Sequence, residues 1–145
     1  MIVYVDSSIV ARAYLADEPG HNAAVAVLRN PENTIVTGSW TRIEVTGALI
    51  RSARARGRDA AELLAGLEAD ITTGAVMTVD VLQAEVEGIA LSIVKRHGTR
   101  AMDAWHLACA SLALPALAEP GEQLGFATRD AEQAAVAREL GFATL

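Results

Sequence analysis

The sequence is poor in cysteine, histidine, aromatic residues and long apolar runs. A single cysteine, Cys109, excludes an intrachain disulfide framework and fits a reducing compartment. With only three histidines, it also cannot supply the ligands of a structural zinc site. The longest stretch of low polarity, residues 108–118, is interrupted by Ser111 and Pro115, whereas a membrane span needs about 20 apolar residues. The N-terminus lacks a basic segment, so we expect no signal peptide, no membrane association and a cytoplasmic protein.

The composition is that of a folded domain with an acidic surface. Of the 145 residues, 52% are hydrophobic and 21% are charged, which excludes a disordered chain. A chain of this length builds one domain with a sizeable core. The formal net charge of −6 argues against nucleic-acid binding through general positive charge. It leaves open an enzyme that holds nucleic acid locally.

Short apolar strands alternate with helical stretches along the chain. The strands are expected at residues 2–5, 34–37, 76–79 and 124–128, with a possible last strand at 142–145. Helices are expected to begin near Asp6, Ala23, Ser39, Asp59, Asp80, Arg100 and Asp130. The helix from Arg100 is expected to end at Leu114, before Pro115, and an irregular stretch follows at residues 116–123. This order predicts one domain over residues 1–145. Its fold class is α/β, a three-layer α/β/α sandwich with a mostly parallel central sheet of four to five strands.

Four carboxylates are expected at the carboxyl edge of this sheet. Asp6 directly follows the first strand and Asp130 follows the fourth by two residues, while Glu44 and Asp103 lie early in helices that begin near that edge. Converging carboxylates raise each other's pKa unless a cation compensates them. Mg²⁺, for which Mn²⁺ can substitute, prefers such oxygen ligands. The cluster therefore favours metal-assisted phosphodiester hydrolysis, which needs no histidine or lysine base.

Each of these acids also has a purely structural interpretation. Asp6 can cap the helix that follows it, and Asp130 with Gln133 reads as a capping box. Glu44 can be a solvated helix-surface residue. Asp103, near a helix N-terminus, gains from the helix dipole alone. The residues by themselves leave both interpretations open.

Arginine and histidine near these acids are further candidates. Arg51 lies seven residues after Glu44 on the same helix face, about 10 Å along the axis, where it could contact an RNA phosphate. Alternatively Arg51, Arg54 and Arg56 only complement the dipole at the helix C-terminus. His106 could lie near the site or be a packed core histidine.

The acids and their local contexts resemble one family over essentially the whole chain. The matching segments are VYVDSS at 3–8, SWTRIE at 39–44, DAWHLA at 103–108 and GFATRD at 125–130, in this order. Together they resemble PIN-domain proteins, specifically the VapC ribonuclease toxins of type II toxin–antitoxin systems. The resemblance implies that the four acids hold Mg²⁺ and that neighbouring hydroxyl groups support the metal and its waters. The acids are Asp6, Glu44, Asp103 and Asp130, and the hydroxyls belong to Ser7 or Ser8 and to Thr128.

The resemblance also implies a biological role. Such toxins are small endoribonucleases that arrest translation, usually homodimers, each neutralised by a cognate antitoxin that places an arginine in the acidic groove. The RNA target stays open, because loop shape and stacking surfaces decide it. One alternative is a catalytically idle PIN-fold binding module that acts through an RNA or protein partner. A receiver-type signalling domain is disfavoured, because it needs a lysine near its end and the only lysine is Lys95.

Overall fold

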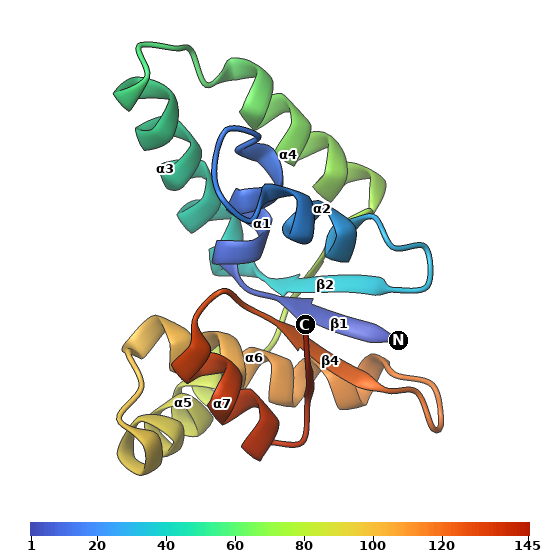
Figure 1. Cartoon of the computed structure of the whole chain (residues 1–145). Helices are drawn as coiled ribbons and strands as arrows, with labels where there is room; N and C mark the ends of the chain where they lie inside the picture. Colours follow the sequence, from blue (N-terminus) through green and yellow to red (C-terminus); the bar gives the residue numbers. More distant parts are fainter.

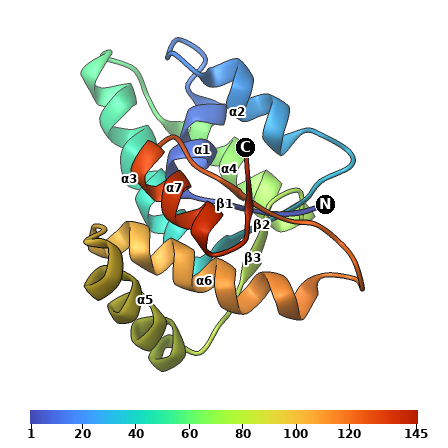
Figure 2. The ribbon, with the colours of Figure 1, turned by 60° about the horizontal axis from the view of Figure 1, so that its bottom comes forward.

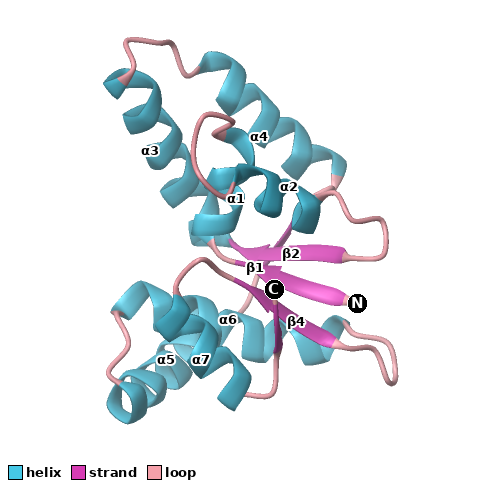
Figure 3. Ribbon diagram, in the orientation of Figure 1, coloured by secondary structure: helices cyan, strands magenta, loops and turns pink.

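A five-stranded, all-parallel sheet runs through the middle of the molecule (Figures 1 and 3). The computed structural model describes residues 1–145. The strand order is β3-β2-β1-β4-β5. The strands are β1 (Ile2–Val5), β2 (Thr34–Gly38), β3 (Met77–Val79), β4 (Leu124–Ala127) and β5 (Ala143–Thr144). The predicted three-layer α/β/α class is confirmed, and the sheet is wholly rather than mostly parallel.

Seven helices form the two outer layers. They are α1 (Ser7–Tyr14), α2 (His21–Leu28), α3 (Ser39–Ala55), α4 (Ala61–Thr73), α5 (Gln83–His97), α6 (Ala101–Leu117) and α7 (Ala131–Glu139). Figure 1 shows the first four on one side of the sheet and the last three on the other. In the turned view of Figure 2, α5 and α6 lie side by side. Each layer covers one apolar face of the sheet, as parallel sheets require.

The central strand β1 contributes to both cores because its side chains alternate between the faces. Val3 and Val5 pack into the core formed with α1 to α4, and Ile2 and Tyr4 pack into the core formed with α5 to α7. All four side chains are buried. This double burial explains why the strand reads as a continuous apolar run, and it fixes β1 rigidly beside the residues that follow it.

Two helix boundaries differ from the sequence prediction. The helix expected from Asp80 begins at Gln83 instead, because residues 80–82 continue as a loop after β3. The helix expected to end at Leu114 runs through Pro115 to Leu117. Pro115 lies in the last turn, where the ring removes one backbone donor but the Ala118 N–H still bonds Leu114 O at 2.9 Å. The irregular stretch is therefore confined to residues 118–123.

None of the seven helices combines the length and the apolar character that crossing a bilayer would demand.

Candidate functional site

The two central strands end side by side and deliver their following residues to the same edge. Val5 of β1 pairs with Ala127 of β4, and the Asp6 N–H donates to Ala127 O at 3.1 Å. Thr128 follows Ala127 directly. The carboxyl edge of the sheet thus places Asp6 against Thr128, as the α/β rule for ligand sites predicts.

Asp6 caps α1 and is only 5% exposed. Its Oδ1 accepts from the Ser8 N–H (2.9 Å), the Ser8 hydroxyl (2.7 Å) and the Ile9 N–H (3.1 Å). Its Oδ2 lies 2.7 Å from Thr128 Oγ1, which donates to it. The capping role is therefore real, and it also holds the carboxylate in one orientation at the sheet edge. Ser8 and Thr128 both contact Asp6, as expected of supporting hydroxyls.

Asp130 caps α7, but not through the predicted capping box. Its Oδ1 accepts from the Glu132 N–H (2.8 Å) and the Gln133 N–H (3.0 Å). In a capping box the Gln133 side chain would turn back to the Asp130 N–H. That N–H instead donates to Thr128 Oγ1 at 3.0 Å, and the Gln133 amide bridges Thr128 Oγ1 (2.6 Å) and Asp103 O (3.2 Å). Gln133 is thus a buried link between α6, α7 and β4 that the sequence pattern did not indicate.

Asp103 lies in the first turn of α6, and its carboxylate has no hydrogen-bond or ion-pair partner in the protein. Partial burial raises the pKa of Asp103, and the charges of Asp130 and Asp6 raise it further, against the opposing effect of Arg100 and His106. Asp6 and Asp130 therefore both lie close enough to Asp103 to disfavour its ionised form. The structure brings together this part of the predicted constellation.

Glu44 lies on α3 and is held by side chains of α1 and α6. Its Oε2 accepts from the Ser7 hydroxyl and from His106 Nε2 at 2.9 Å. Burial raises the pKa of Glu44, but the hydrogen bonds from His106 and Ser7 and the charge interaction with His106 outweigh burial, so the pKa lies below its ordinary value. Glu44 is consequently a held, ionised carboxylate and not the freely solvated surface residue of the alternative interpretation.

Ser7, His106 and Glu44 do not form a serine-hydrolase triad. A triad needs the acid and the serine on opposite ring nitrogens of the histidine. Here both lie at Nε2, with Ser7 Oγ at 3.0 Å, while Nδ1 is 2.9 Å from the Tyr4 hydroxyl. This arrangement cannot relay a proton from Ser7 through the ring to Glu44.

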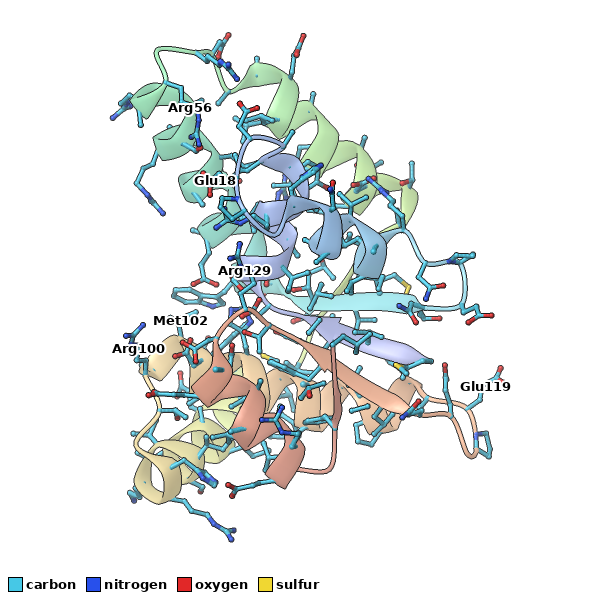
Figure 4. The ribbon with its side chains drawn as sticks, in the orientation of Figure 1. Glu18, Arg56, Arg100, Met102, Glu119 and Arg129 are labelled. Atoms are coloured by element: carbon cyan, nitrogen blue, oxygen red, sulfur yellow. The ribbon has the colours of Figure 1, made fainter.

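A groove of about 580 Å³ runs from Ser7, Ser8 and Glu44 toward Arg51 and Arg129. Arg51 makes no ion pair, and its guanidinium folds back over Gly47, with one nitrogen 3.0 Å from where an added Cβ would stand. Figure 4 shows Arg129 at the end of the molecule to which the strands point. The groove therefore carries cationic side chains beside Glu44.

Sequence reasoning did not single out Arg129 or its anchoring. Its backbone N–H donates to Ser8 Oγ at 3.1 Å, and its guanidinium donates to Pro19 O at 2.7 Å. The sequence signal that could have indicated Arg129 is its position between Thr128 and Asp130. The structure thus adds a fixed arginine to the groove wall.

The oxygen-rich donor set fits a hard divalent cation. The aspartates at the sheet edge repel one another, and a cation would remove that repulsion. However, no three His, Cys, Asp or Glu side chains in the structure are arranged to hold a metal by themselves. Mg²⁺ is usually bound by one or two carboxylates, with waters and substrate phosphates completing the octahedron. The residues therefore fit a metal site that the substrate completes.

The fold and its acidic edge define the chain as an α/β protein with a site suited to phosphate esters. The family comparison is more specific: residues 3–139 match the PIN domain model, and the chain belongs to the PIN domain family. PIN domains are generally nucleases that use divalent metals such as Mg²⁺, so the family supports hydrolysis of nucleic acid. A search of curated proteins gives no significant match.

Proposed function

We propose that this PIN domain is a Mg²⁺-dependent endoribonuclease toxin that a cognate antitoxin neutralises. The observation that carries the proposal is the carboxyl edge of the sheet, where Asp6 lies against Thr128 and where the charges of Asp130 and Asp6 act on Asp103. Asp103 has no partner within the protein. Family membership supports a nuclease, and the sequence segments shared with VapC toxins support the finer role.

In the proposed mechanism Asp6 and Asp103 would hold Mg²⁺ directly, and Glu44 and Asp130 would complete the acidic surroundings. When bound, Mg²⁺ supplies Lewis acidity that polarises the phosphoryl group and stabilises the leaving alkoxide. Ser8 and Thr128 keep the Asp6 carboxylate oriented through the hydrogen bonds described above.

Glu44 then accepts a proton from the attacking water through its second oxygen, Oε1. The water oxygen forms the new bond to phosphorus, and the bond from phosphorus to O3′ breaks with its electron pair going to O3′. O3′ takes up a proton from solvent water, which leaves a 5′-phosphate and a 3′-hydroxyl. Arg51 contacts a neighbouring phosphate along the groove, because its guanidinium is unpaired there.

The proposed partners follow from the same acidic edge. An antitoxin arginine placed at the carboxyl edge of the sheet would compensate the aspartates and exclude the metal. We further propose that the protein acts in the cytoplasm as a homodimer. These partners are tested by co-purification with the product of a neighbouring reading frame and by measuring molar mass in solution.

The deciding experiment measures cleavage of a panel of structured RNAs by the purified chain. Cleavage with Mg²⁺, its loss in EDTA and its recovery with Mg²⁺ or Mn²⁺ support the proposal. The Asp6→Asn/Asp103→Asn double variant controls for a contaminating ribonuclease. Metal-dependent cleavage that persists in this variant refutes the site assignment. RNA binding without any cleavage by the wild-type chain favours the alternative of a catalytically idle binding module.

A further inference from the structure

A buried series of hydrogen bonds connects the backbone of β2 with Glu44. The Gly38 N–H donates to the Tyr4 hydroxyl oxygen at 3.0 Å. The Tyr4 hydroxyl lies 2.9 Å from His106 Nδ1, and His106 Nε2 lies 2.9 Å from Glu44 Oε2. Tyr4 and His106 are both buried, so no water competes for these groups.

The direction of each hydrogen bond in this series follows from donor counting. A backbone N–H can only donate, so the Tyr4 oxygen accepts from Gly38. The single hydroxyl proton of Tyr4 is then free to donate to Nδ1 of His106. A neutral imidazole that accepts at Nδ1 carries its proton at Nε2. His106 therefore donates from Nε2 to Glu44.

Tight packing keeps the two rings of this series in place. Tyr4 stacks on Phe126 with ring centroids 5.5 Å apart, and His106 makes an edge contact with Trp105 at 5.3 Å. A Cβ added to Gly38 would stand 2.7 Å from the Tyr4 hydroxyl and 2.6 Å from the Trp105 ring. Only glycine at position 38 lets both side chains approach the backbone this closely.

Glu44 receives both of its protein donors on one carboxylate oxygen. His106 Nε2 and the Ser7 hydroxyl both bond Oε2, and Oε1 has no protein partner. Glu44, about half buried, lines the groove together with Ser7. The two donors thus fix the carboxylate rotation and leave one oxygen available to the groove.

We propose that Tyr4 and His106 are positioning residues that fix the orientation of the Glu44 carboxylate. The inference rests on the proposed nuclease function, in which Glu44 Oε1 accepts the proton of the attacking water. Tyr4 acts only through the tautomer of His106, and His106 acts only through Glu44. Neither residue touches the substrate in this arrangement.

The first test reads the tautomer of His106 in the wild-type protein without metal or RNA. Two-bond ¹⁵N–¹H correlation spectra of protein labelled with ¹⁵N-histidine distinguish a proton at Nε2 from one at Nδ1, and His106→Gln assigns the signals. We expect a proton at Nε2 and none at Nδ1. A proton at Nδ1 overturns the inference.

The second test measures kcat and KM for RNA cleavage in three test variants and two matched controls. We expect Tyr4→Phe and His106→Leu to lower kcat at least tenfold while KM changes less than twofold. His106→Gln is expected to recover most of kcat, because its amide can donate to Glu44 from nearly the position of Nε2. The matched controls are Tyr14→Phe, which removes a hydroxyl bonded to Asp70, and His97→Gln at the His97–Glu139 pair.

The outcomes separate this inference from the proposed function. A wild-type chain that cleaves no RNA refutes the function, and the tautomer spectrum still decides the inference. A folded Tyr4→Phe variant with wild-type kcat refutes the inference and leaves the function standing. If neither Tyr4→Phe nor His106→Leu folds, the tautomer of His106 in the wild-type protein decides whether the inference holds.

Discussion

Asp6 combines a structural and a proposed catalytic role in one side chain. As the N-cap of α1 it satisfies two backbone N–H groups, and asparagine caps a helix about as well as aspartate does. We therefore expect Asp6→Asn to abolish metal-dependent cleavage with little change in the free energy of unfolding. Asp6→Ala should abolish cleavage and also cost about 1 kcal/mol. Urea unfolding and an RNA cleavage assay on both variants check this, and cleavage by folded Asp6→Asn contradicts it.

The raised pKa of Asp103 predicts that the stability of the metal-free protein depends on pH. The pKa of Asp103 is raised in the folded protein, which means that folding disfavours the ionised carboxylate. The ionised carboxylate therefore lowers the free energy of unfolding once the pH has risen through the raised pKa. Below the ordinary pKa of 3.8 the carboxyl is protonated in both states, and this effect is absent. Asp103→Asn should therefore make the metal-free protein more stable than wild type at pH 7. The difference should vanish as the pH falls below 3.8.

Urea unfolding in EDTA at several pH values measures this difference. Asp103→Asn also tests the proposed site. At neutral pH this variant should not cleave RNA, although it should be more stable than wild type. A variant that is less stable than wild type at pH 7 would contradict the uncompensated charge inferred for Asp103.

At the scale of the element, α3 presents a glycine where helix propensity disfavours one. An added Cβ at Gly47 would meet the Arg51 guanidinium at 3.0 Å, whereas a Cβ at Gly88 of α5 meets nothing within 4 Å. We expect Gly47→Ala and Gly88→Ala each to stabilise the protein by up to about 1 kcal/mol. Only Gly47→Ala should weaken RNA binding, because it displaces Arg51 from the groove. Thermal unfolding measures the stability of each variant, and titration with a non-cleaved RNA measures its RNA affinity. Equal RNA affinities of Gly47→Ala and Gly88→Ala would contradict a contact between Arg51 and RNA.

The elements themselves could largely be predicted, and their hydrogen-bond partners could not. The apolar run at residues 2–5 and the capping residue Asp6 gave β1 and the start of α1, because local patterns determine such elements. The link between Tyr4 and His106 spans 102 positions of sequence. In the sequence, Tyr4 reads as one apolar strand residue and His106 as a packed helix residue, so only the folded arrangement pairs them.

The same limit applies to the candidate site. The rule for parallel sheets placed Asp6 and Asp130 at one edge, and the helix position of Asp103 brought it there too. The hydrogen bonds of Glu44 to Ser7 and His106 were not indicated by the sequence. Side-chain direction decides such contacts, and periodicity does not determine it to within a few ångströms.

At the scale of the whole molecule, metal binding should appear as added stability. If Mg²⁺ binds the native state and not the unfolded chain, a concentration of 100 times Kd adds about 2.7 kcal/mol. We expect the melting temperature of the wild-type chain to rise with Mg²⁺ and that of Asp6→Asn/Asp103→Asn not to rise. Differential scanning calorimetry at constant ionic strength measures both. An equal rise in the two proteins would show that the ion binds elsewhere.

The placement of β1 between β2 and β4 also has a consequence for the newly made chain. Asp6 meets Thr128 across 122 positions of sequence, and β1 can pair with β4 only after β4 has been synthesised. Contacts this remote form slowly, because a long loop must close before they stabilise anything. A ribosome-bound fragment that ends before β4 therefore carries Asp6 and Glu44 but no assembled acidic edge. Under the proposed nuclease function, the chain therefore cannot cut RNA before β4 has been synthesised.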